Sequence, residues 1–166
     1  MQTNITTERL SLNLLTLDDH DFIMRLVNSN GWIEFIGDRN VHTKEDAIAY
    51  INKIRSTKNL YYWVVRIKNE NTPIGIISFL KRSYLDNFDI GFAFLPQFNG
   101  NGYAYEASKE ILSMVSRNSD YTVILATTVP QNVNSIKLLT KLGLRFEKEI
   151  KVEKETLHIY SNSITN

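Results

Sequence analysis

The sequence predicts one mixed α/β domain over residues 1–166, in which a mostly antiparallel sheet of six or seven strands is flanked by about four helices. Segments rich in β-branched and aromatic residues alternate with amphipathic helical patterns along the chain. The hydrophobic content of 43% and the charged content of 22% are those of an ordinary globular protein. A chain of 166 residues can bury one core and is short for two.

The first half of the chain carries the patterns of three strands and two helices. Apolar residues alternate in the first strand, whereas they recur at helical spacing in both helices. Aromatic and β-branched residues mark the second strand, and a turn at 69–73 returns the third strand antiparallel to it. In chain order we expect a strand over 10–15, helices from 18 to about 27 and over 44–54, and strands over 60–67 and 74–80.

The second half of the chain predicts two further helices and four strands. Apolar residues recur at i, i+4 spacing from Tyr103 onward, and the last helix lies between Pro130 and the glycine stop at Gly143. In chain order we expect a strand over 88–95, a helix over 103–115, a strand over 121–127, the last helix, and antiparallel strands over 144–152 and 156–162.

The loop between the strand over 88–95 and the helix at Tyr103 is the most informative segment. A helix N-terminus presents unpaired N–H groups, and Gly100 and Gly102 let the backbone close around a phosphate. The loop therefore predicts a phosphate or pyrophosphate site, with glycines that merely ease a corner as the alternative. Tyr105 occupies the place of the third glycine of a dinucleotide loop, and Gly-Lys-Ser/Thr is absent, which argues against a nucleotide-binding regulator.

The same loop resembles motif A of the GNAT superfamily of N-acetyltransferases, Arg/Gln-x-x-Gly-x-Gly/Ala. Asn99 stands in the Arg/Gln place, where a neutral amide lacks the charge assistance of arginine. The resemblance implies acetyl-CoA as co-substrate and no metal. It assigns the pyrophosphate to Asn99, Gly100, Asn101, Gly102, Tyr103 and Ala104.

Three more segments extend the resemblance over essentially the whole chain. Residues 132–144 are similar to Asn-x-x-Ser-x-x-Leu-Leu-x-x-Leu-Gly-Phe, with Leu144 in the place of the phenylalanine. Residues 7–15 resemble the Thr-Glu-Arg-Leu first strand of the branch typified by ribosomal-protein N-terminal acetylases, and 35–47 resemble its signature between the first two helices. The resemblance implies a GNAT fold with splayed central strands.

The resemblance also implies direct acetyl transfer to an amine in a ternary complex, which suits a chain without cysteine. Pantetheine would pair with backbone at Phe94 and Leu95 on the splayed strand. Ser135 is the candidate acid for the leaving thiolate, because Leu139 occupies the place where relatives carry a tyrosine; alternatively Ser135 bonds backbone at the helix start. Asn132 orients pantetheine or caps that helix.

The base and the acceptor pocket carry weaker signals. Asp89 begins an Asp-Ile-Gly-Phe sequence like the Glu-Ile-Gly-Tyr of relatives and is the candidate base; alternatively it is a strand-entry aspartate that bonds solvent. Glu34 is the candidate to bind a cationic acceptor; alternatively it is only a surface residue. Trp32 is the candidate to line the acceptor pocket; alternatively it belongs to the core.

Composition restricts the partners. A net charge of +1 gives no basic field for nucleic acid or membrane, and the three histidines lack metal-ligand spacing. No apolar run approaches transmembrane length and the N-terminus lacks a signal pattern, so a cytoplasmic location is expected. The acceptor stays open among protein N-termini, polyamines, antibiotics and other small amines, and a homodimer is plausible by resemblance. The rival function is a catalytically weak or inactive CoA-binding sensor.

Overall fold

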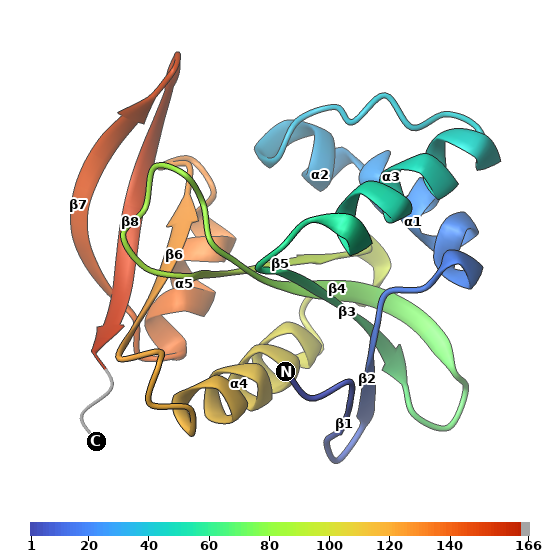
Figure 1. The fold of residues 1–166 in the computed structure, drawn as a ribbon, viewed down its shortest axis with the longest axis horizontal. Helices are drawn as coiled ribbons and strands as arrows, with labels where there is room; N and C mark the ends of the chain where they lie inside the picture. The colour runs from blue at the N-terminus through green and yellow to red at the C-terminus, as the bar shows by residue number, and fades with distance from the viewer. Residues whose placement is uncertain (164–166) are drawn as a thin grey trace.

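The computed structural model describes residues 1–163, which form one eight-stranded sheet with helices on both faces (Figure 1). The sheet order is β1-β2-β3-β4-β5-β6-β8-β7. The strands are β1 Asn4–Thr6, β2 Leu10–Leu14, β3 Leu60–Ile67, β4 Thr72–Leu80, β5 Asp89–Phe94, β6 Val123–Thr128, β7 Arg145–Val152 and β8 Glu155–Ser163. The helices are α1 His20–Val27, α2 Asn30–Phe35, α3 Lys44–Ser56, α4 Tyr103–Ser116 and α5 Val133–Lys141, with short 3-10 turns η1 Leu17–Asp19 and η2 Pro96–Phe98.

The mixed α/β fold expected from the sequence is confirmed, with two additions among the described residues. The eighth strand is β1, a three-residue edge strand that is too short to carry a periodic pattern. The fifth helix is α2, which contains Gly31 and buries Trp32. Strands β3 and β4 pair antiparallel as expected, although β4 begins at Thr72 and so includes Pro73 next to a register shift in β3.

Two apolar layers cover the two faces of the sheet. Successive side chains of a strand point to opposite faces, so Trp63 and Val65 face α4 whereas Val64 faces α1 and α3. Because both faces are covered, the central strands are apolar at consecutive positions and do not alternate with polar residues. In Figure 1 helix α4 lies on one side of the sheet, and α1, α2 and α3 lie on the other.

The centre of the sheet is open between β5 and β6. These strands form a parallel pair that bridges at a single position, Asp89 opposite Leu125, where the Leu125 N–H donates to the Phe88 carbonyl at 2.9 Å. Every other neighbouring pair in the sheet is antiparallel and bridges at three or more positions. Beyond the bridge the two strands diverge, which confirms the splayed central strands and leaves one edge of β5 without a partner strand.

Candidate active site

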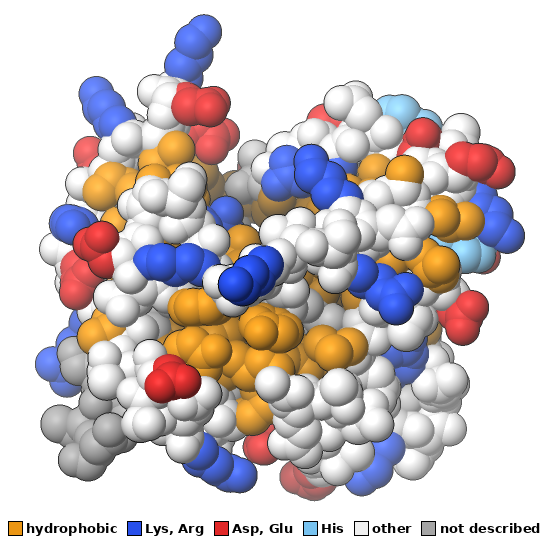
Figure 2. All heavy atoms as spheres, in the orientation of Figure 1, with side chains coloured by type: hydrophobic (Ala, Val, Ile, Leu, Met, Phe, Trp, Pro, Cys, Tyr) orange, Lys and Arg blue, Asp and Glu red, His pale blue; other side chains and the backbone are white. Residues whose placement is uncertain are grey.

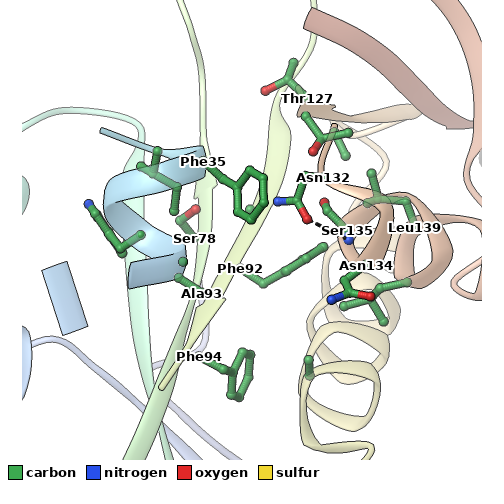
Figure 3. Close-up of a pocket in the computed structure, with 18 of the residues that line it drawn as sticks. Phe35, Ser78, Phe92, Ala93, Phe94, Thr127, Asn132, Asn134, Ser135 and Leu139 are labelled. Atoms are coloured by element: carbon green, nitrogen blue, oxygen red, sulfur yellow. Dashed lines mark hydrogen bonds between the residues drawn. The ribbon is translucent and has the colours of Figure 1, made fainter. Parts of the chain in front are cut away.

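A cavity of about 1460 Å³ fills the space between the diverging strands (Figure 3). Its walls come from β4, β5 and β6, from the loop and first turn of α4, and from the beginning of α5. Helix α2 and the turn between β7 and β8 close the remaining sides. Segments that are remote in sequence therefore meet around one space that is large enough for two ligands.

The glycine loop lines one end of the cavity. Gly100 and Gly102 both have φ of +79°, a left-handed conformation that L side chains rarely adopt, and Gly102 is the N-cap of α4. Asn99, Gly100, Gly102, Tyr103 and Ala104 line the cavity as the sequence predicts. Asn101 does not line it. Its side-chain amide donates to the carbonyls of Phe98 and Asn99, each at 3.2 Å, so Asn101 shapes the loop.

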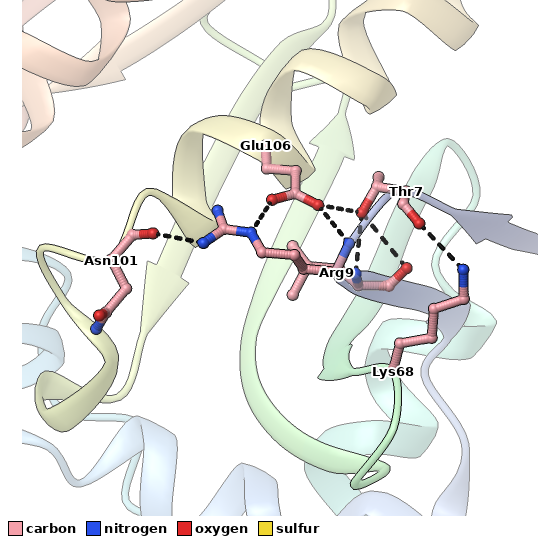
Figure 4. Close-up of polar contacts among 6 residues, drawn as sticks. Thr7, Arg9, Lys68, Asn101 and Glu106 are labelled. Carbon is pink, nitrogen blue, oxygen red and sulfur yellow. Dashed lines mark hydrogen bonds and ion pairs between the residues drawn. The ribbon is translucent and has the colours of Figure 1, made fainter.

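A polar network behind α4 fixes this loop (Figure 4). Glu106 accepts from the Thr7 hydroxyl at 2.6 Å, from the Arg9 N–H at 2.9 Å and from Arg9 Nε at 2.7 Å. Arg9 Nη1 donates to the Asn101 carbonyl at 3.0 Å, and its guanidinium lies 4.6 Å from the Tyr103 ring centroid. Burial alone would raise the pKa of Glu106, but the hydrogen bonds from Thr7 and Arg9 lower it below its usual value.

Glu106 does not line the cavity, and its carboxylate is held by Thr7 and Arg9, so its role is structural. Sequence reasoning missed Arg9 as part of the site. Arg9 belongs to the Thr-Glu-Arg-Leu segment, which indicated only a first strand, and its contacts to α4 appear only when β2 is folded against that helix.

The unpaired edge of β5 leads from the loop into the cavity. The Leu95 N–H donates to the Ile74 carbonyl at 2.9 Å, and Leu95 is buried away from the cavity, which leaves that N–H unavailable to pantetheine. In an antiparallel ladder alternate residues bond to the same neighbour, so Phe94 and Phe92 direct their N–H and carbonyl groups away from β4. Both line the cavity. Phe94 is therefore placed as predicted, Leu95 is not, and Phe92 was missed.

Asn132 and Ser135 line the cavity at the beginning of α5 (Figure 3). The Asn132 carboxamide oxygen accepts from the Ser135 N–H at 3.1 Å, so Asn132 does cap the helix. The Ser135 hydroxyl makes no hydrogen bond within residues 1–163, so it is not used in a backbone bond at the helix start. Leu139 lies one turn along α5 on the same wall.

Asp89 lies beneath the cavity and does not line it. Its side chain accepts from Arg82 Nε at 2.8 Å and from the Thr127 hydroxyl at 3.2 Å, and Arg82 and Thr127 are the residues that reach the cavity. With 1% of its surface exposed, Asp89 bonds no solvent, so that alternative is wrong. Burial raises the pKa of Asp89, while Arg82 and Thr127 act in the opposite direction.

The sequence predicts an acidic side chain, Glu34, at the end of the cavity next to α2, but arginines line this end instead. Trp32 is buried and lines the cavity, but Glu34 is exposed on the outer side of α2 and does not. Arg39 and Arg82 line this end, and sequence reasoning missed both. They lie in loops, after α2 and after β4, so no periodic pattern relates them to each other or to the cavity.

Among residues 1–163, neither a group of metal-ligating side chains nor a membrane-spanning helix is found. Within residues 1–163 no group of three or more His, Asp or Glu side chains could hold a metal ion. None of the helices in the same part of the chain is long and apolar enough to cross a membrane.

Comparisons with known proteins identify relatives of the chain. The model of an acetyltransferase (GNAT) domain family matches residues 9–145. An uncharacterized N-acetyltransferase of Bacillus subtilis, YnaD, is 31% identical over 144 residues, which are 87% of this chain and 84% of that protein. A GNAT-family acetyltransferase of Bacillus anthracis superposes with a TM-score of 0.82 at 26% identity, over 97% of this chain and 98% of that one. The fold also matches RimL, a ribosomal L7/L12 acetyltransferase solved with coenzyme A, with a TM-score of 0.83 at 14% identity over 97% and 98% of the chains.

Proposed function

Because the chain belongs to the GNAT family of acetyltransferases, we propose that it moves the acetyl group of acetyl-CoA directly to a primary amine within a ternary complex. One observation carries the proposal. A single cavity runs from a left-handed glycine loop at a helix N-terminus, along an unpaired strand edge, to the free hydroxyl of Ser135 and on to α2. A cofactor and an acceptor can meet in such a space without a covalent enzyme intermediate.

In this arrangement the pyrophosphate binds the N–H groups of the loop over 99–104, where the dipole of α4 favours an anion. Pantetheine continues along the free backbone groups of Phe92 and Phe94. Asn99 supplies a neutral amide where an arginine would add charge, so the loop depends more on its backbone donors than a loop with arginine would.

The acceptor nitrogen attacks the thioester carbonyl carbon, so a C–N bond forms and the C–S bond breaks. The hydroxyl of Ser135 gives a proton to the leaving thiolate, and the proton that the attacking nitrogen loses as the amide forms restores that hydroxyl. Asp89 holds Arg82 in place and does not touch the reacting atoms. It is therefore a positioning residue in this proposal, not the base.

Ser135→Ala tests the proposed acid. We expect kcat to fall by about a hundredfold, because a positioned proton donor contributes about 10²–10⁴ in rate. The dissociation constant for acetyl-CoA should stay unchanged, since the backbone N–H of Ser135 still bonds Asn132. Ser56→Ala, at the exposed end of α3, is the matched control. An unchanged kcat in Ser135→Ala would remove Ser135 from the mechanism.

The rival function, a CoA-binding sensor without turnover, is separated by measuring binding and turnover independently. At about a hundred times Kd, acetyl-CoA should stabilise the wild type by about 2.7 kcal/mol. Gly102→Glu should abolish this shift, whereas Gly143→Glu, at another left-handed glycine outside the cavity wall, should keep it. Binding without acetylation of any amine in a broad panel would favour the sensor.

A further inference from the structure

We propose that the acceptor amine carries an anionic group, a carboxylate or a phosphate, that binds to Arg39 and Arg82 at the α2 end of the cavity. This inference rests on the proposed acetyl transfer and names the class of its acceptor. It reverses the expectation from the sequence, in which Glu34 would have selected a cationic acceptor. Glu34 faces outward, and arginines occupy the wall where it was expected.

Hydrogen-bond donors without acceptors gather at this end of the cavity. The Trp32 indole N–H is buried with no partner within residues 1–163, and Trp32 itself is only 4% exposed. Arg82 uses Nε for Asp89, and its two Nη groups bond to no described residue. Arg39 forms no ion pair in the same part of the chain. Arg39 is exposed and Arg82 partly buried, so both are open to a ligand, whereas the Trp32 N–H is buried, and buried donors are normally satisfied. A ligand that supplies acceptor oxygens therefore fits this wall.

Arg39, Tyr62 and Arg82 all line this cavity. Burial raises the pKa of the Tyr62 hydroxyl, and the positive charges of Arg82 and Arg39 act to lower it. Two guanidinium groups around one pocket match the planar or tetrahedral oxygens of a carboxylate or phosphate, with which arginine forms paired hydrogen bonds.

The wall opposite Arg39 and Arg82 carries carboxylates that can attract the amine end of an acceptor whose other end is anionic. Glu153 and Glu155 line the cavity from the turn between β7 and β8, together with Lys154. These carboxylates lie on a different wall from Arg39 and Arg82 and can attract the protonated acceptor, whose nitrogen loses a proton before it attacks the thioester. Figure 2 shows both Lys or Arg and Asp or Glu side chains beside the hollow between the β7–β8 hairpin and helices α2 and α3.

A matched series of short amines tests the acceptor class. The series contains four amines that differ in their second group, which is anionic in 2-aminoethyl phosphate and β-alanine, uncharged in ethanolamine and cationic in 1,3-diaminopropane. We expect kcat/KM for at least one of the two anionic amines to exceed that for ethanolamine and diaminopropane by tenfold or more. The phosphate and carboxylate arms then tell which anion the site prefers. Equal or higher kcat/KM for the neutral and cationic amines would overturn the inference.

Arg39→Gln tests the residue, and Arg55→Gln, exposed on α3 outside the cavity wall, is the matched control. Arg39 is the better choice than Arg82, because removing Arg82 would leave Asp89 buried without its partner. We expect Arg39→Gln to raise KM for the anionic amines about tenfold and to change KM for ethanolamine less than twofold. An equal effect on all amines, or no effect on any, contradicts the assignment.

A binding measurement keeps this inference separate from the proposed transfer. The chain has two tryptophans, and the Trp63 indole N–H donates to the Gln2 carbonyl at 3.0 Å, whereas that of Trp32 has no described partner. In ¹⁵N-labelled protein saturated with CoA, β-alanine or 2-aminoethyl phosphate should shift the Trp32 indole resonance and leave that of Trp63 in place. Ethanolamine at the same concentration should shift neither.

The two failures are distinguishable. A Trp32 shift with the anionic amines but no acetylation of any amine would reject the transfer and keep the anion site. Turnover that ignores acceptor charge, with no selective Trp32 shift, would keep the transfer and reject the anion site.

Discussion

Glu106 shows at the scale of one residue how the phosphate loop is tied to the N-terminal strand. Thr7 and Arg9 lie almost a hundred positions earlier, yet three of their donors reach this one carboxylate. Arg9 continues to the carbonyl of Asn101 and so holds the loop from behind. The charge of Glu106 is thereby neutralised outside the cavity, so it does not repel an anion at the N-terminus of α4.

Glu106→Gln is expected to destabilise the protein by about 2 kcal/mol near neutral pH, because it weakens charge-assisted hydrogen bonds. The pKa of Glu106 is lowered by folding, so its contribution is present above the ordinary glutamate pKa and is lost as pH falls through the lowered value. The unfolding free energies of wild type and variant should therefore converge in acid. Denaturant titrations from neutral to acidic pH measure this.

Glu110→Gln is the control for that series, since Glu110 lies one turn further along α4 and makes no side-chain hydrogen bond within residues 1–163. It should change stability little at any pH. A constant difference between Glu106→Gln and wild type across the range would show that the effect is packing, not charge.

Single residues of the site were predictable where the backbone dictates their type. Gly100 and Gly102 stand out in the sequence because a strand-to-helix loop needs left-handed residues, and the structure gives both a positive φ. Asp89 was found for its position, but its role depends on Arg82 and Thr127 beside it. Such neighbours come from other segments, so sequence reasoning could not assign them.

At the scale of an element, α5 depends on its cap. Asn132→Ala should cost about 1 kcal/mol of stability, whereas Asn132→Asp keeps an acceptor for the Ser135 N–H and should cost much less. If capping were the whole role of Asn132, acetyl-CoA affinity in Asn132→Asp would equal that of wild type. A loss of affinity with retained stability would instead assign Asn132 to the cofactor. Thermal unfolding and calorimetric titration of both variants measure the two quantities.

Acetyl-CoA is expected to slow amide hydrogen exchange at alternate residues of β5. The N–H groups of Ala93 and Leu95 point to β4, whereas those of Phe92 and Phe94 point to the open edge. Acetyl-CoA should slow exchange at Phe92 and Phe94 strongly and at Ala93 little. Equal slowing at all of these positions would indicate general tightening, and unchanged exchange at Phe92 and Phe94 would argue against pantetheine along this edge. Amide exchange followed by NMR gives the answer residue by residue.

Helices and strands were predictable where a clear hydrophobic periodicity extends over many residues. All seven strands and four helices expected from hydrophobic spacing form, because tertiary packing uses the same apolar faces. Helix α2 has six residues that include Gly31, which disfavours a helix, and it forms around the burial of Trp32. Strand β1 has three residues and is held by pairing with β2. Local sequence could not reveal either of them.

For the whole molecule, the sequence predicted the residues of the glycine-loop end of the cavity better than those of the α2 end, where the acceptor is proposed to bind. The phosphate end is one continuous loop, so its chemistry is legible in order along the chain. The acceptor end combines α2, the loop after β4 and the β7–β8 turn, and the charge of that wall depends on which side chains face inward. Cytoplasmic location and homodimer formation stay predictions.

Because β5 and β6 bridge at a single position, we expect that the chain can be divided into two associating fragments. Residues 117–120 form an exposed turn between α4 and β6, and the cavity walls before and after it belong to different pieces of chain. Fragments 1–118 and 119–166 would share one core, to which the second fragment contributes Ile124, Leu139 and Tyr160. The ring centroids of Tyr121 and Phe79 lie 5.1 Å apart across the division. A cofactor that contacts both fragments should stabilise their complex, because it binds the assembled form more tightly than either fragment alone. Mixed fragments are expected to associate more tightly as acetyl-CoA is added, which sedimentation would detect, and the severed protein would become a reporter of acetyl-CoA concentration.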